Sequence, residues 1–243
     1  MAVSAYPRFY FREDPVNHDP FFPTAEELPE ILPIFPLAGV LLLPGGTLPL
    51  NIFEPRYLNM TSDTLKTNER MIGMVQPTGA DDADTGASSG RQKPEVYPMG
   101  CAGRLVSFTE TGDGRYLINL AGISRFHIRE ELPFLHGYRR VRPDFSDYED
   151  DLELGLPTSI DRGRLTSALK HYFKTQGIDP DWPAIEKMED RDLVTFLAMG
   201  CPFSPPEKQA LLEADGLEAC SLVLLTLLEM AGAPDIGGEG TRH

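Results

Sequence analysis

The stretch that decides the fold is residues 43–57, which read LPGGTLPLNIFEPRY. Within it, residues 47–53 are a short strand-like run bounded by glycine and proline. Pro55 then suits the first position of a helix, because its missing N–H would have no intrahelical acceptor there. A stripe of side chains at helical spacing predicts a helix over residues 55–68. The stripe consists of Tyr57, Met60, Thr61, Thr64 and Leu65.

Further strand-like runs lie on both sides of this stretch, from Ile31 to Pro143. Each is short and bounded by Pro, Gly or Asp, which is typical of a β-rich domain. Residues 111–114, Thr-Gly-Asp-Gly, lie between two such runs. They predict a tight hairpin with a type I′ turn, because Asp-Gly accepts the positive φ angles of that turn.

Helical patterns replace the strands after residue 158. Thr158 or Ser159 can cap a helix that runs to Gln176 and stops at Gly177. A second helix is predicted from Asp190 to Gly200, and residues 204–207, Ser-Pro-Pro-Glu, have the form of a capping box. A last helix presents apolar residues at helical spacing, which predicts a small helical bundle. They are Leu217, Cys220, Val223, Leu224, Leu227 and Leu228.

These patterns divide the chain into five expected parts and predict an α+β fold. The parts are an extended arm of aromatics and prolines (1–30), a β-rich domain (31–143), an acidic linker (144–158), a helical subdomain (159–231) and a flexible tail (232–243). Residues 77–95, between Gln76 and Val96, interrupt the β-rich domain with a run of Gly, Ala, Asp and Ser. Such a run has little to bury, so a mobile loop is expected there.

The composition excludes several functional classes. The 243 residues carry 37 Asp and Glu against 22 Lys and Arg, a formal net charge of −15. A generic nucleic-acid binder is disfavoured, because such binding draws its affinity from local positive charge. The first residues lack the apolar core of a signal peptide, and no apolar run approaches the ~20 residues of a membrane-spanning helix. We therefore expect a soluble cytoplasmic protein without membrane contact.

Neither a metal site nor a cofactor site is indicated. The three cysteines, Cys101, Cys201 and Cys220, are odd in number and unrelated in spacing. They predict no disulfide framework and no metal knuckle, which suits a reducing cytoplasm. The five histidines show no metal-binding spacing either.

One motif suggests hydrolysis. Residues 86–90, Gly-Ala-Ser-Ser-Gly, match the G-x-S-x-G nucleophile elbow. That elbow requires a buried strand before it and a helix after it. Here DDADT precedes the motif and RQKPE follows it, so Ser88 is predicted to belong to a linker.

Six segments between residues 31 and 143 form a distinctive pattern. They are LPIFPL (32–37), the 43–57 stretch, MIG (71–73), MGCA (99–102), DGR (113–115) and LAGISRF (120–126). With this pattern, residues 31–143 resemble the N-terminal domain of Lon proteases. The resemblance implies a PUA-like pseudo-barrel of twisted strands with one inserted helix, followed by helices. It also implies a role in holding unfolded or partner polypeptides, a protease or chaperone among them.

A complete Lon protease continues into an ATPase module and a Ser-Lys peptidase. This sequence contains no G-x-x-x-x-G-K-[ST] motif to bind phosphates and no recognisable Lys-activated serine. It also lacks the paired cysteines of the zinc module that follows this domain in cereblon-like proteins. The pattern is that of solitary bacterial Lon-domain proteins, so a non-enzymatic protein is expected.

Polypeptide binding requires an apolar groove with exposed backbone edges. Apolar residues around the signature exceed what one sheet face needs, although residues of short strands are more often core. The candidates are Phe35, Pro36, Leu37, Leu42, Leu43 and Phe53. The signature residues expected to be structural are Glu54, Pro55, Arg56, Tyr57, Gly122, Arg125 and Phe126. Among them, Glu54 is expected to accept hydrogen bonds from backbone amides at the helix start, and Arg56 to clamp the barrel.

RNA binding is the alternative function. PUA-like folds occur in RNA-binding proteins, and the last strands hold a group of arginines. They are Arg125, Arg129, Arg139, Arg140 and Arg142. Glu130, Glu131, Asp144 and Asp147 are interleaved with or adjacent to them, within a Debye length of ~8–10 Å. A salt-bridged face is therefore favoured over a phosphate-binding one.

Overall fold

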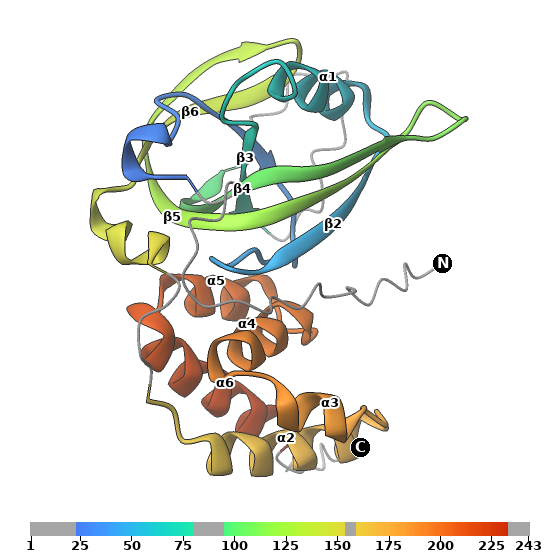
Figure 1. Cartoon of the computed structure of the whole chain (residues 1–243), viewed down its shortest axis with the longest axis vertical. Helices are drawn as coiled ribbons and strands as arrows, with labels where there is room; N and C mark the ends of the chain where they lie inside the picture. Colours follow the sequence, from blue (N-terminus) through green and yellow to red (C-terminus); the bar gives the residue numbers. More distant parts are fainter. Residues whose placement is uncertain (1–22, 80–94, 154–158, 233–243) are drawn as a thin grey trace, which may run out of the picture. The chain divides into compact units, whose positions relative to one another are not determined.

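The computed structural model describes residues 23–79, 95–153 and 159–232 (Figure 1). Most of the predicted N-terminal arm, the centre of the predicted loop with Ser88, residues 154–158 of the linker and nearly all of the tail lie outside the described residues. The described residues before 154, together with residues 195–213, form one compact unit. Residues 159–194 and 214–232 form a second. The predicted helical subdomain is thus divided between the two units.

The first unit is built on a six-stranded sheet with the order β2-β5-β4-β3-β1-β6. Only β1 and β3 pair in parallel, and the other pairs are antiparallel. The strands are β1 (Leu32–Pro36), β2 (Thr47–Ile52), β3 (Met71–Pro77), β4 (Val96–Glu110), β5 (Tyr116–Leu135) and β6 (Tyr138–Asp144).

Strand β5 closes the sheet into a barrel. Its 20 residues pair with β2 and β4 in the first half and with β4 and β6 in the second. The strands β5, β4, β3, β1 and β6 therefore form a closed ring, and β2 adds to it along β5. Closure removes exposed strand edges. The predicted α+β pseudo-barrel is confirmed.

A bulge in β5 allows this double pairing. Ala102 of β4 pairs with Ser124 and Gly103 pairs with Gly122, which leaves Ile123 as an extra residue in β5. A bulge of this kind bends a strand and increases its twist. The first half of β5 can therefore follow β2 while the second half turns toward β6.

Gly122, beside this bulge, makes a backbone approach that no other residue could make. Its N–H donates to the carbonyl of Gly46 at 2.8 Å, and its carbonyl accepts from the N–H of Gly45 at 2.9 Å. A Cβ at residue 122 would lie 2.0 Å from the carbonyl oxygen of Leu43. The LPGG segment of the signature thus lies directly against β5.

The core of the barrel is centred on Phe126, which is fully buried. A Cβ at Gly73 or at Gly100 would each lie 2.8 Å from its ring, so two neighbouring strands make room for one aromatic side chain. The other buried members of this cluster are Leu32, Ile34, Met71, Val75, Ala102, Ile123 and Val141.

Helix α1 (Pro55–Thr64) follows β2 as the sequence predicts, with its apolar stripe buried at Tyr57, Met60, Thr61 and Thr64. It ends four residues before the predicted boundary. The chain then tightens, because the N–H of Lys66 donates to Asp63 and that of Thr67 donates to Thr64. These i→i+3 bonds are typical of a 3₁₀ end to a helix.

The predicted hairpin joins β4 and β5, but its turn is not type I′. Of the turn residues, only Gly114 has a positive φ, of 79°. Its N–H donates to the carbonyl of Thr111 at 3.0 Å. A three-residue loop, here residues 112–114, that ends in a left-handed glycine is typical of the type I turn with a G1 bulge, an alternative connection for such hairpins.

Short helices complete the first unit. They are the 3₁₀ helices η1 (Ala25–Glu27) and η2 (Ser146–Leu152) and the α-helix α5 (Pro205–Glu213). At the start of α5, the backbone N–H of Ser204 donates to the Glu207 carboxylate at 2.7 Å, which is one of the two hydrogen bonds of the predicted capping box. The division between the units falls within α4 (Asp190–Gly200).

The second unit contains α2 (Arg162–Gln176), α3 (Trp182–Lys187) and α6 (Gly216–Gly232). Helix α2 stops at Gly177 as predicted, with φ of 66°. Its cap is Asp161 rather than Thr158 or Ser159, because the Asp161 carboxylate accepts from the N–H of Arg164 at 2.9 Å. None of the helices in the described part of the chain has both the length and the apolarity to cross a bilayer.

We expect Gly122→Ala to lower the free energy of unfolding by about 1–3 kcal/mol or more, because the added methyl group must displace the Leu43 carbonyl. Urea denaturation followed by circular dichroism would measure the change. Gly112→Ala is the matched control, since a Cβ at residue 112 has no neighbour within 4 Å. Equal midpoints for the two variants would contradict the close approach at Gly122.

Candidate functional site

The structure places most of the predicted apolar binding residues in the core. Phe35, Pro36, Leu42 and Leu43 are buried, and Leu37 is half-buried. The ring of Phe35 packs on that of Tyr57, with centroids 4.0 Å apart. β1 is one of the strands of the closed ring, and Phe35 and Pro36 on it are buried. Phe53 alone of the six is exposed, at 61%.

Exposed apolar side chains instead gather on a hairpin arm, residues 106–118 of β4 and β5 with Phe53 beside them. Figure 1 shows the two strands running together beyond the rest of the sheet to their turn. Phe108 is 38% exposed and Leu117 is 46% exposed. Phe108 pairs with Ile118, and Leu117 pairs with Thr109. Successive residues of a strand point to opposite faces, so the arm is apolar on both faces.

Contacts at the tip of the arm hold its aromatic side chains in place. The rings of Phe108 and Tyr116 meet edge to face, with centroids 4.9 Å apart. The Arg115 guanidinium lies 5.9 Å from the centroid of the Phe53 ring and is paired with Asp113 at 3.0 Å. Phe108 and Leu117 were not among the predicted binding residues. For Leu117 the signal was present, because Tyr116, Leu117 and Ile118 are three consecutive apolar residues and so put apolar side chains on both faces of a strand.

The Glu54-Pro55-Arg56 corner is held by an internal ion pair. Arg56 Nη2 lies 2.6 Å from Glu54 Oε2, and Nε lies 3.1 Å from the same oxygen. The guanidinium also lies 4.7 Å from the centroid of the Tyr57 ring. Glu54 occupies the N-cap position, yet its side chain accepts no hydrogen bond from the helix backbone. The predicted capping by Glu54 is wrong, because Arg56 takes its carboxylate.

The arginines of the last strands are paired internally. Arg139 lies 2.7 Å from Glu131, Arg129 lies 3.0 Å from Asp144, and Arg142 lies 3.4 Å from Glu130. Arg140 donates to the carbonyl of Pro133 at 3.0 Å. The predicted salt-bridged face is present. A phosphate backbone would have to compete with these carboxylates for the same guanidinium groups.

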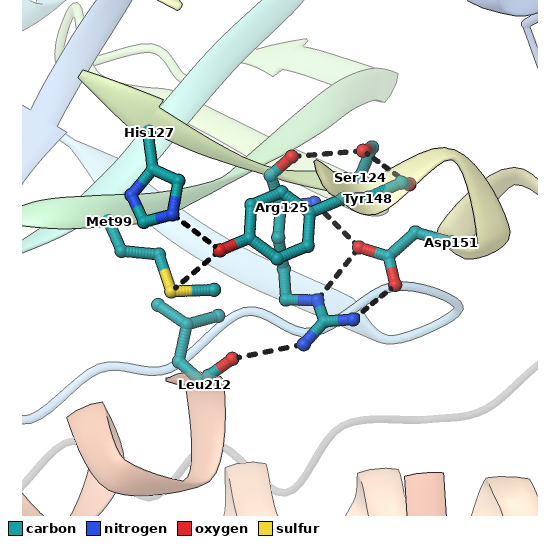
Figure 2. A network of polar contacts seen from close by, with 7 residues as sticks. All are labelled: Met99, Ser124, Arg125, His127, Tyr148, Asp151 and Leu212. Atoms are coloured by element: carbon teal, nitrogen blue, oxygen red, sulfur yellow. Dashed lines mark hydrogen bonds and ion pairs between the residues drawn. The ribbon is translucent and has the colours of Figure 1, made fainter. Parts of the chain in front are cut away.

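The side chain of Arg125 is buried, as is that of Arg139, but Arg125 belongs to a polar network that joins three elements (Figure 2). Its Nε and Nη2 each donate to a different oxygen of Asp151 at 2.8 Å, and its backbone N–H donates to the same carboxylate at 2.9 Å. Nη1 reaches the carbonyl of Leu212 in α5 at 3.4 Å. The charged groups satisfy each other, so the network joins β5, η2 and α5.

Tyr148 extends the network to His127 (Figure 2). Its ring lies over the Arg125 guanidinium at 4.7 Å, and its hydroxyl lies 2.8 Å from His127 Nε2. Ser124 donates to the backbone carbonyl of Arg125 at 3.0 Å. Residues 146–152 of the predicted acidic linker form η2, and Asp151 within it is held by the buried guanidinium of Arg125.

The pKa directions of Arg125 and Tyr148 follow from their surroundings in this network. Burial alone would lower the pKa of Arg125, but the hydrogen bonds and charge of Asp151 outweigh it and raise that pKa. Burial also raises the pKa of the Tyr148 phenol. The arginine therefore keeps its charge, and the phenol keeps its proton near neutral pH.

The cysteines lack the character of nucleophiles. Burial raises the pKa of Cys101 well above its ordinary value, and the nearby Asp151 adds to this effect. Burial likewise raises the pKa of Cys201 to about 12, and Cys220 is buried. A thiol in such surroundings stays protonated and unreactive. In the segments that the structure describes, no three His, Cys, Asp or Glu side chains are grouped to hold a metal ion.

We expect Asp151→Ala to lower the free energy of unfolding by about 3–5 kcal/mol, because it leaves a guanidinium buried without its partner. The double variant Arg125→Met with Asp151→Leu should lose less than the sum of its two single variants. Asp150→Ala is the matched control, because Asp150 is exposed next to Asp151. Strictly additive losses in thermal unfolding would contradict coupling through this pair.

Comparisons with known proteins agree with this architecture. The family model described as the ATP-dependent protease La (LON) substrate-binding domain matches residues 31–229. Lon protease 2 of Myxococcus xanthus is 28% identical over 213 residues, which cover 84% of this chain and 24% of the relative. Lon protease of Anaeromyxobacter dehalogenans is 29% identical over 88% of this chain and 25% of its own length. The chain spans about a quarter of the length of these curated relatives.

Two solved structures share the fold. One is a Lon N-terminal domain protein from Xanthomonas campestris, with a TM-score of 0.52 and 22% identity, covering 81% of this chain and 97% of that one. The other is the N-terminal domain of a Mycobacterium avium complex Lon protease, with a TM-score of 0.55 and 11% identity, covering 82% of this chain and 97% of that one. With a family match that extends from the first strand into the last helix, the chain belongs to the LON substrate-binding domain family.

Proposed function

We propose that this protein is a non-catalytic polypeptide-binding module whose hairpin arm contacts the bound chain. The observation that carries the proposal is the pair of apolar faces on the arm, where Phe53, Phe108 and Leu117 are exposed. A strand that covers a core is normally apolar on one face and polar on the other. Apolar residues on both faces are instead typical of a surface that is covered by a partner.

The chemistry of the arm suits an unfolded or extended polypeptide. Such a chain offers apolar side chains, and full burial of one large apolar side chain is worth about 1.5–3 kcal/mol. The contacts of Phe108 with Tyr116 and of Phe53 with Arg115 restrict the aromatic rings before binding. Less conformational entropy is then lost when a partner binds. The bound partners would be unfolded proteins or a separate protease or chaperone.

The absence of catalysis is part of the same proposal. The matched relatives are similar to this chain over about a quarter of their own length, and the family model covers a substrate-binding domain. The buried thiols stay protonated, and the arginines of the last strands are held by carboxylates or a carbonyl. No observation favours RNA binding as a second function.

We expect the triple variant Phe53→Ser, Phe108→Ser and Leu117→Ser to weaken the binding of an unfolded polypeptide by at least tenfold, about 1.4 kcal/mol or more. Fluorescence anisotropy with a labelled, permanently unfolded model protein would measure the dissociation constant, with and without ATP. The control replaces two other exposed apolar residues, Leu222→Ser and Met230→Ser, which are 60% and 66% exposed on α6.

Equal affinities of the triple variant and the wild type would contradict the role of the arm. If the α6 control loses as much affinity as the triple variant, binding does not depend on where the exposed apolar residues lie. That result would also contradict the role of the arm. The proposed absence of catalysis has a separate test, in which an active-site serine probe is incubated with the wild-type protein and with Ser88→Ala. If the probe labels the wild-type protein but not Ser88→Ala, Ser88 is a reactive nucleophile and the proposed absence of catalysis is wrong.

A further inference from the structure

Besides the hairpin arm, the first unit has a pocket of about 260 Å³ between residues 25–30 and residues 145–152. Its apolar walls are Leu28, Phe145 and Leu152, which also pack against the core around Phe126. Tyr148 lines the pocket as well. The pocket is thus an opening at which the apolar interior of the barrel reaches the surface.

The rim of this pocket is uniformly acidic. Glu30 and Glu149 line it from opposite sides. The segments on either side carry further exposed carboxylates, Glu26 and Glu27 on one and Asp147 and Asp150 on the other. Neither residues 24–30 nor residues 145–152 contain a Lys or Arg. The only carboxylate of these segments that is buried in an ion pair is Asp151, with Arg125.

Hydrogen bonds and an ion pair hold both walls of the pocket. The η1 wall is held by the capping box in which the Thr24 N–H donates to Glu27 at 2.9 Å. The η2 wall is held by Asp151 against Arg125 and by the Tyr148 hydroxyl against His127. A pocket of fixed shape loses little conformational entropy when it is filled.

We infer that this pocket binds an apolar side chain from a polypeptide segment that also carries lysine or arginine. Apolar walls recognise the side chain, while the carboxylates of the rim attract neighbouring cationic groups and repel acidic segments. The acidic charge of the whole chain adds to this selection, because the field of many like charges raises the local concentration of opposite ones. The inference rests on the proposed function and adds a preference for basic, apolar segments.

The test uses two labelled peptides with the same apolar residues, one with Lys and the other with Glu at the polar positions. We expect the Lys peptide to bind at least tenfold more tightly at low salt, and the difference to shrink at 0.5 M salt, where screening is strong. Glu30→Gln with Glu149→Gln should weaken the Lys peptide by about three- to tenfold, since each exposed charge contributes modestly.

The matched control is Asp179→Asn with Glu186→Gln, which removes the same two negative charges from exposed positions of the second unit. Ala25→Arg is a further variant, because it places a cation at the pocket wall and should weaken the Lys peptide without touching the arm. Ala231→Arg, exposed on α6, makes the same change of charge elsewhere.

The outcomes separate this inference from the proposed function. Equal binding of both peptides, or equal effects of the rim variant and its control, would overturn the inference. If the arm variant then abolishes binding, the proposed function stands. If the Lys peptide survives the arm variant but is lost in the rim variant, the pocket is supported and the role of the arm is wrong. Binding of neither peptide would overturn both.

Discussion

The barrel depends on one close approach, that of the Leu43 carbonyl to Gly122. Only a residue without a side chain can lie there, since a Cβ would be 2.0 Å from that oxygen. The next residue, Ile123, forms the bulge that allows β5 to pair with three strands. Side chains alternate along a strand, so this local geometry also sends Phe126 into the core and Arg125 toward η2. The LPGG segment and LAGISRF are therefore one structural motif, although about seventy residues separate them.

The Arg125–Asp151 pair contributes more to the placement of η2 on β5 than to the folding free energy. A buried ion pair recovers much of its desolvation cost only when its hydrogen bonds are well made, and apolar residues of similar volume are often as stable. Here the carboxylate accepts three bonds from one residue, which fixes η2 at one place on β5. The same anchoring holds Tyr148 over the guanidinium. One wall of the acidic pocket thus owes its shape to a buried pair beneath it.

Features with a local cause could be predicted from the sequence, and features with a distant cause could not. The helix start at Pro55, the stop at Gly177 and the cap at Ser204 each depend on residues within four positions. By contrast, residues 146–152 look like an acidic linker until Arg125, 26 positions from Asp151, is known to be its partner. Phe35 and Leu42 look like groove residues because closure of the sheet, which buries them, is not visible in any short segment.

Electrostatics distinguishes the two candidate classes of partner. The field of a chain with a net charge of −15 opposes a polyanion everywhere except at a local basic patch. The one candidate patch, on β5 and β6, has its arginines bound to Glu131, Asp144 and Glu130. The same field attracts a cationic polypeptide, and the acidic pocket joins that attraction to an apolar floor. Charge thus agrees with the proposed preference for basic polypeptides over RNA, and the exposed apolar side chains agree with the proposed binding of unfolded segments.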